Sequence, residues 1–307
     1  MKQLLILLTS GTLLLSCGNN NNLSNSNNTN NDVSSSNDIS KKEILITSIP
    51  PLKWLVQKIA GDNFEVISII QPNMNHELFD PKPNDLKALE NSKLFFTYNI
   101  LSFENKISNT VTNKEKIANL LENLDKSFLL ENNDDDHGHE SKDDDHSHEE
   151  FDPHIWFSLE LMPQFANDIK NKLIEAYPDK KEVFEKNHSM FLSELNNFKT
   201  EIDGKINNKT KKYFMIYHPS LGYFLKNYNI KEISIEYQGK EPSAKQIKEI
   251  IIEAKKHNVS TILVQPQFAK QSIEAISKEI SNSKIIEFNA DEENVFENLR
   301  KLVDNLE

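Results

Sequence analysis

Short apolar runs alternate with amphipathic stretches over most of the chain. Residues 44–49 (ILITSI) form an apolar run that ends at Pro50 and Pro51, which predicts a buried strand. Apolar side chains then recur at helical spacing as far as Gly61, which predicts a helix. Further strands are predicted at 64–70, 93–98, 213–217, 231–236, 260–265 and 284–288, with helices between them. Strands that alternate with helices in this way indicate an α/β fold with mostly parallel sheets.

One long amphipathic stretch separates two such βα regions. Between residues 179 and 208 apolar side chains recur every three or four positions without a proline, which predicts a single helix of about 28 residues, roughly 40 Å long. His188 lies on its apolar stripe and is interpreted as a packing residue, not a ligand. The predicted organisation is an N-terminal α/β lobe at 43–178, the linking helix at 179–208, and a C-terminal α/β lobe at 209–307.

The first 42 residues predict export and a membrane anchor. Residues 1–16 have the apolar character of a signal peptide, and the apolar stretch is too short and interrupted to span a bilayer. Residues 14–17, Leu-Leu-Ser-Cys, resemble a bacterial lipobox, which implies that Cys17 carries the lipid. Residues 17–42 are rich in Asn and Ser and predict a flexible tether. We therefore expect a protein anchored to the membrane by a lipid on Cys17 and facing the periplasm or the cell exterior.

The net charge of −12 argues against a nucleic-acid partner, because phosphate binding depends on clustered Lys and Arg. Much of the acidic character lies in an insert at residues 132–150, where three aspartates precede each of two His-x-His pairs. The four histidines are His137, His139, His146 and His148. A polar tract of this kind is expected to lack order without metal, and the cost of ordering it would make its metal sites weak. We interpret it as a loop that gathers or senses metal ions; the alternative is a solvated insert without a role.

Four other side chains have a different kind of position. His76, His218 and Asp291 each follow a predicted strand, and His154 precedes a helix within the segment DPHIWFS. Ligands of open α/β sheets bind in the crevice outside the carboxyl ends of the strands. These side chains are therefore expected to face a common cleft.

Several motifs, in their order and spacing, resemble a known family. They are TSIPPLKWLVQKIAGD, NMNHELFDPKPND, DPHIWFS, YHPSLGYF, GKEPSAKQI and ENLRKLVDNL. From Glu43 to Leu306 the chain resembles the substrate-binding receptors of zinc and manganese ABC transporters. The resemblance implies two α/β lobes joined by a long helix, one metal ion in the cleft between them, and an ABC permease with its cytoplasmic ATPase as partner. It also implies that His76, His154 and His218 are metal ligands.

The resemblance points to zinc more than to manganese. Manganese members of the family place a carboxylate where this chain has His218, and three imidazoles suit Zn²⁺ whereas Mn²⁺ favours oxygen donors. Asp291 is the predicted fourth ligand, with Glu292 or water as alternatives. Zinc affinity is expected to fall as the pH drops through about 6.5, where an ordinary histidine becomes protonated.

A site closed by four protein ligands would leave no position for a catalytic water, and neither an HExxH motif nor a glycine-rich phosphate loop is present. The expected protein is therefore a monomeric zinc receptor and not an enzyme. The alternatives are a manganese receptor of the same family, a surface adhesin whose metal only stabilises the fold, and a zinc-dependent hydrolase.

Overall fold

A computed structural model describes residues 42–71, 74–131, 151–236, 240–266 and 271–307. The signal peptide, Cys17, all of the predicted tether before Lys42 and the four histidines of the acidic insert lie outside these ranges. Within them, no helix combines the length and the apolar composition that a membrane crossing requires.

The first lobe is built on a four-stranded parallel sheet with the order β2-β1-β3-β4. Its strands are β1 (Glu43–Thr47), β2 (Phe64–Ser68), β3 (Phe95–Thr97) and β4 (Ile117–Asn119). Its helices are α1 (Pro50–Ala60), α2 (Pro83–Asn91), α3 (Ser102–Thr110) and α4 (Met162–Ala176), with 3₁₀ turns at Lys114–Lys116, Lys126–Phe128 and Ile155–Phe157.

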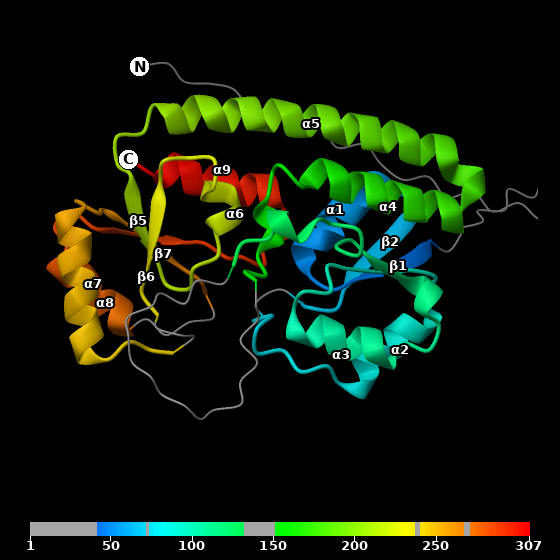
Figure 1. The fold of residues 1–307 in the computed structure, drawn as a ribbon, viewed down its shortest axis with the longest axis horizontal. Coiled ribbons are helices and arrows are strands. Elements are labelled where there is room, and N and C mark those ends of the chain that lie inside the picture. Colours follow the sequence, from blue (N-terminus) through cyan, green and yellow to red (C-terminus); the bar gives the residue numbers. More distant parts are fainter. Residues whose placement is uncertain (1–41, 72–73, 132–150, 237–239, 267–270) are drawn as a thin grey trace, which may run out of the picture. The chain divides into compact units, whose positions relative to one another are not determined.

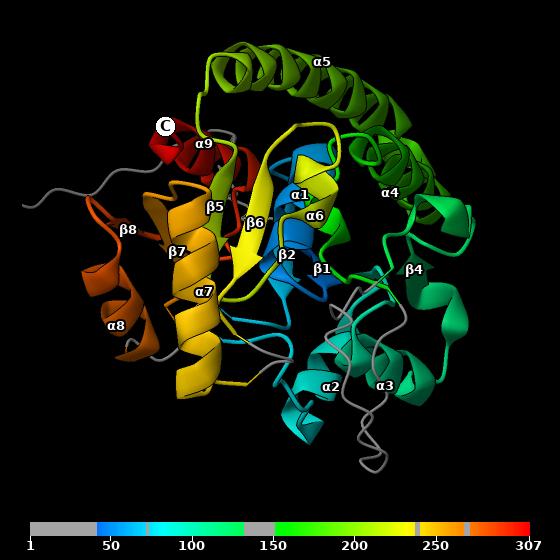
Figure 2. The same cartoon turned by 60° about the vertical axis from the view of Figure 1, so that its left-hand side comes forward.

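The second lobe repeats this design with the order β6-β5-β7-β8, again all parallel. Its strands are β5 (Tyr213–Ile216), β6 (Lys231–Ser234), β7 (Thr261–Val264) and β8 (Lys284–Glu287). Its helices are α6 (Gly222–Leu225), α7 (Ala244–Lys256), α8 (Gln271–Glu279) and α9 (Val295–Asn305). Helices α7 and α8 lie together beside this sheet, as Figure 2 shows.

The predicted linking helix is α5 (Lys181–Asn207), 27 residues long and preceded by a 3₁₀ turn at Pro178–Lys180. It runs along α4, α1 and α9 (Figure 1). Phe191 of α5 meets Trp54 of α1 with ring centroids 5.8 Å apart, and Phe198 stacks on Phe296 of α9 at 4.2 Å. The helix therefore packs against both lobes, and the predicted fold class is confirmed.

The tight turn after α1 requires a glycine at position 61. Pro50 and Pro51 occupy the first turn of α1, where a missing N–H costs no helical hydrogen bond. At the other end Gly61 adopts φ +77°, and a Cβ there would lie 2.8 Å from the side-chain nitrogen of Asn187 on α5. Any other residue would be strained at this φ, and the side chain of Asn187 would have to move to make room for its Cβ.

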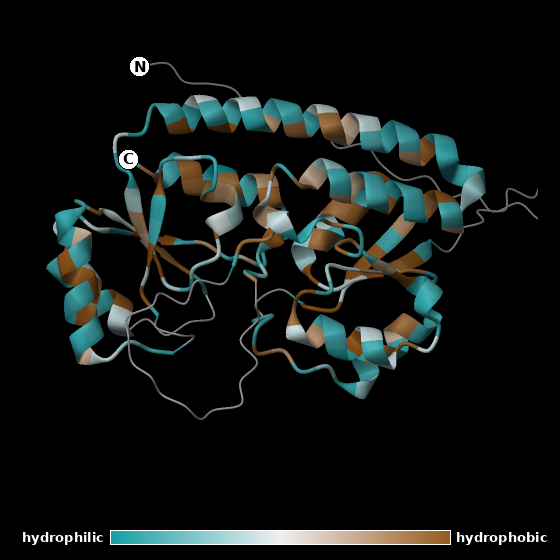
Figure 3. Cartoon of the chain, viewed as in Figure 1, coloured by the Kyte–Doolittle hydropathy of each residue, from teal (hydrophilic) through white to brown (hydrophobic). Residues whose placement is uncertain are grey.

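One apolar core extends through both lobes. It includes Leu45 and Phe96 from the first sheet and Phe214, Leu263 and Phe288 from the second lobe, all almost completely buried. A smaller cluster fills the space between the second sheet and α7 and α8. Apolar residues follow the strands, whereas much of α5 is polar (Figure 3). The two lobes are thus joined by shared hydrophobic packing as well as by α5.

Candidate metal centre

His76 lies in the loop between β2 and α2 and is 4% exposed. Its Nδ1 is 2.8 and 2.9 Å from the two carboxylate oxygens of Asp291, which follows β8 in the second lobe. Its other ring nitrogen, Nε2, is buried and has no hydrogen-bond partner. Leaving such an atom unpaired is costly, so each instance calls for an explanation.

His154 immediately precedes the 3₁₀ turn at Ile155–Phe157 and is 2% exposed. Asp152 accepts a hydrogen bond from its backbone N–H at 2.9 Å, and the same carboxylate oxygen lies 2.8 Å from its Nδ1. Pro153 between them stiffens the backbone of this short turn. The Nε2 of His154 is again buried without a hydrogen-bond partner.

His218 follows β5 by two residues. Its Nδ1 is 2.6 Å from Glu236, which lies beyond the end of the neighbouring strand β6, and its Nε2 is 2.9 Å from Glu77. The side chain of Gln265 forms hydrogen bonds with both backbone groups of His218. It accepts from the N–H at 3.3 Å and donates to the C=O at 3.0 Å. The backbone of His218 is thereby tied to the end of β7.

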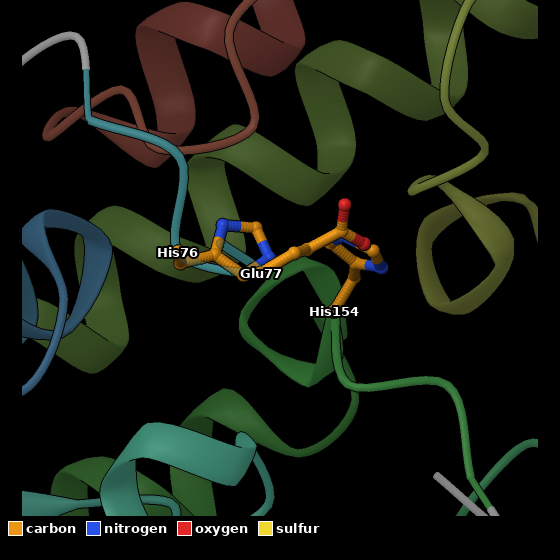
Figure 4. A group of neighbouring side chains, drawn as sticks. All are labelled: His76, Glu77 and His154. Atoms are coloured by element: carbon orange, nitrogen blue, oxygen red, sulfur yellow. The ribbon is translucent and has the colours of Figure 1, made fainter. Parts of the chain in front are cut away.

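The three imidazoles come from remote segments and meet at one place. The ring centroids of His76 and His154 are 5.4 Å apart, and those of His154 and His218 are 5.2 Å apart. The potential ligand atoms of His76, Glu77 and His154 all lie within 4.8 Å of one another, as Figure 4 illustrates. Within the part of the chain that the structure describes, His76, Glu77 and His154 form the group of potential ligands whose atoms are close enough together to hold a metal ion.

Each of these histidines has its own carboxylate at Nδ1: Asp291 for His76, Asp152 for His154 and Glu236 for His218. At His76 and His154 such a carboxylate favours a proton on Nδ1 and leaves the Nε2 lone pair available, which is the usual arrangement around metal-binding histidines, whereas the Nε2 of His218 faces Glu77. His76, His154 and Glu77 therefore form a group suited to a divalent cation, and His218 lies beside it with its Nε2 2.9 Å from Glu77.

The carboxylates also set the charge of the centre. Burial opposes a charge on His218, but hydrogen bonds with Glu236 and Glu77 outweigh it and raise its pKa to about 10. At His76 burial is likewise outweighed by Asp291, and the pKa is raised, whereas at His154 burial prevails over Asp152 and the pKa is lowered. Although burial opposes its charge, the hydrogen bond with His218 lowers the pKa of Glu77 to about 2. Glu77 is therefore an anion whenever the site can bind a cation.

A family model described as the periplasmic zinc-uptake complex component A matches residues 45–307. The chain belongs to this family. Its members are substrate-binding receptors of zinc and manganese ABC transporters, and the recognition of the family from sequence motifs is confirmed.

Relatives of the chain differ in the metal that they are named for. The high-affinity zinc uptake system protein ZnuA of Bacillus subtilis is 26% identical over 239 residues, which are 77% of this chain and 75% of the relative. The manganese ABC transporter substrate-binding lipoprotein scaA of Streptococcus gordonii is 26% identical over 232 residues, or 73% and 72%. The crystal structure of ZnuA superimposes with a TM-score of 0.74 at 28% identity, covering 86% of this chain and 97% of that one.

The sequence of this member of the component A family predicted some of the residues of the metal centre. The structure brings His76, His154 and His218 together, and it places Asp291 on the Nδ1 of His76 instead of beside the Nε2 atoms. Glu292, the alternative fourth ligand, is exposed.

Three carboxylates of the centre were missed. Glu77 directly follows His76, and Asp152 stands two residues before His154, so proximity in sequence was an available signal for both. Glu236 is 18 residues from His218, and its role depends on the parallel pairing of β5 with β6. No local pattern in the sequence indicates that pairing.

Proposed function

We propose that this chain captures Zn²⁺ outside the cytoplasmic membrane and presents it to an ABC permease for import. The observation that supports this most strongly is the meeting of three buried imidazoles, each with a carboxylate at Nδ1. Such a site binds a cation tightly because its ligands are already oriented before the ion arrives.

In this proposal the Nε2 atoms of His76, His154 and His218 bind the ion, and Glu77 supplies the fourth ligand. Glu77 is preferred over Asp291 because its carboxylate already lies 2.9 Å from the Nε2 of His218, whereas Asp291 is bonded to Nδ1 of His76. The side chain of Glu77 is 32% exposed, so it can meet an incoming ion before the buried histidines do.

Three nitrogen ligands and one oxygen ligand fit the tetrahedral coordination of Zn²⁺. Mn²⁺ prefers a larger share of oxygen ligands, so this donor set favours zinc. Because some relatives are named for zinc and others for manganese, the metal preference of this chain has to be measured. Titration of the purified chain with Zn²⁺ and with Mn²⁺ tests it directly. Tighter binding of Mn²⁺ than of Zn²⁺ would contradict the assignment.

The proposed cycle is capture at the metal centre, docking on the permease and release of the ion. The lipid on Cys17 would hold the receptor at the membrane, and the histidines at 137–148 would raise the local zinc concentration. Because α5 and a shared core join the lobes, separating them would expose apolar surface. Release is therefore proposed to proceed by small displacements around the metal centre.

Replacement of Asp152 by asparagine is expected to weaken zinc binding about 10–100-fold, the usual range for a residue that orients a metal-binding histidine. Asparagine can turn its NH₂ group toward Nδ1 and favour the wrong tautomer of His154. Competition with a chromogenic chelator measures the effect. Asp62→Asn, in the exposed turn after α1, makes the same change of charge and should leave the affinity unaltered. Equal affinities for the two variants would refute the orienting role.

Zinc affinity is expected to rise about tenfold per pH unit between pH 7 and 8.5. The pKa of His218 is raised to about 10, so this ring carries a proton over that range in the metal-free chain, and Zn²⁺ must displace it. Lowering the pH strengthens the competing proton and weakens metal binding. This places the loss of affinity at a higher pH than the value of about 6.5 expected for an ordinary histidine. Chelator competition at a series of pH values measures the slope; a flat profile above pH 7 would contradict the prediction.

A further inference from the structure

Trp156 packs against the candidate metal centre and contacts two of its histidines. It is 1% exposed and belongs to the 3₁₀ turn that follows His154. Its ring centroid is 5.4 Å from that of His76, with the planes at 87°, and 5.1 Å from that of His154, at 64°. One rigid indole therefore restricts the orientation of both imidazoles.

The polar edge of the same indole contacts the second lobe. Its Nε1–H donates a hydrogen bond of 3.0 Å to the backbone oxygen of Ala290. Ala290 directly precedes Asp291, whose carboxylate is bonded to His76. Trp156 thus contacts His76 directly and also holds the peptide that carries the carboxylate orienting it.

The segment around Ala290 is held in place by two hydrogen bonds and a nearby ion pair. The side chain of Asn289 accepts from the N–H of Asp291 at 3.1 Å, and Asn298 of α9 donates to the backbone oxygen of Asn289 at 2.8 Å. Close by, Glu293 is paired with Lys53 of α1 at 2.6 Å. The hydrogen bond of Trp156 therefore joins the first lobe to a firmly held part of the second, directly at the metal centre.

We propose that Trp156 is a positioning residue that sets how slowly the cation leaves, by holding His76, His154 and the Ala290–Asp291 peptide in their binding arrangement. The inference rests on the proposed function. Loss of the indole N–H would leave the buried oxygen of Ala290 unpaired, and relaxation of this peptide would free Asp291 and His76 to move. Such loosening acts on the bound state, so it should appear in the dissociation rate more than in the association rate.

The test is Trp156→Phe in the full chain, with Zn²⁺ as the probe. Phenylalanine keeps an aromatic ring against the histidines but cannot donate to Ala290. Zinc release into excess chelator, followed by stopped flow, should be about tenfold faster or more, as expected for an unpaired buried carbonyl. The association rate should stay within about threefold of the original value.

The chain offers a matched control in its other tryptophan. Trp54 is also buried and packs its ring against Phe191 and Phe296, so Trp54→Phe should reduce thermal stability without changing zinc release. Should Trp156→Phe fail to fold, 3-benzothienylalanine at position 156 in the Trp54→Phe background decides the question. That residue replaces the indole N–H by sulfur at nearly the same shape, and it should also release zinc faster.

Two results would overturn the inference alone: unchanged release from these variants, or equal acceleration by Trp54→Phe. Failure of the unaltered chain to bind one Zn²⁺ would overturn the proposed function, and this inference with it. Because the unaltered chain is titrated with Zn²⁺ first, failure of the proposed function can be told apart from failure of the inference about Trp156.

Discussion

Replacement of His154 by alanine is expected to weaken zinc binding by at least about 100-fold, beyond the range seen when only an orienting residue is lost. In the proposed site its Nε2 bonds directly to the ion. That atom is buried and has no hydrogen-bond partner within the protein. Alanine removes the ligand and leaves Asp152 still able to accept from the backbone N–H at position 154, so the local turn is expected to persist.

His188→Ala is the matched control for this experiment. His188 is half-buried on α5, and its Nε2 is also buried without a hydrogen-bond partner, so the same side chain is truncated in a similar setting. Its replacement should leave zinc affinity unchanged, in keeping with its interpretation as a packing residue. Chelator competition measures both affinities, and similar losses in the two variants would contradict the assignment of His154.

Zinc is expected to stabilise the chain strongly against heat. At a free zinc concentration 1,000 times the dissociation constant, binding to the folded state alone adds about 4 kcal/mol to the free energy of unfolding. For a folded region of this size, with about 2.1 cal/mol/K of unfolding entropy per residue, that corresponds to a rise in Tm of about 7 °C. The effect should be this large because the proposed ligands come from segments that unfolding separates.

Differential scanning calorimetry with and without zinc measures the shift, and excess EDTA should reverse it. His154→Ala should abolish most of it, whereas His188→Ala should retain it. A rise in Tm that survives in His154→Ala would mean that zinc stabilises the chain through another site.

The elements that sequence reasoning identified best are those with a long or sharply ended pattern. The apolar stripe between residues 179 and 208 predicted α5 almost to its ends, because a helix of that length repeats its period many times. The strands of the second lobe are shorter than predicted; β6, expected at 231–236, ends at Ser234. Strand β4 was not predicted, because its three residues, Ile-Ala-Asn, form no apolar run of the kind that marks β3. Its existence depends on pairing with β3.

The metal centre was predictable only in part, for a related reason. His76 and His218 stand at strand ends, a position that the sequence reveals, and the family motifs added His154. The carboxylates at Nδ1 depend on distances between remote segments: Asp291 is 215 residues from His76. Asp291 was expected beside the metal because its position after β8 is visible in sequence, whereas the side of the imidazole that it faces is fixed only by packing around Trp156 and Ala290.

A crystal structure of the zinc-loaded chain, with anomalous scattering recorded at the zinc edge, tests the central claim most directly. One strong peak is expected about 2.0–2.1 Å from the Nε2 atoms of His76, His154 and His218. A zinc ion within bonding distance of fewer than three of these rings, or located elsewhere in the molecule, would contradict the proposed site.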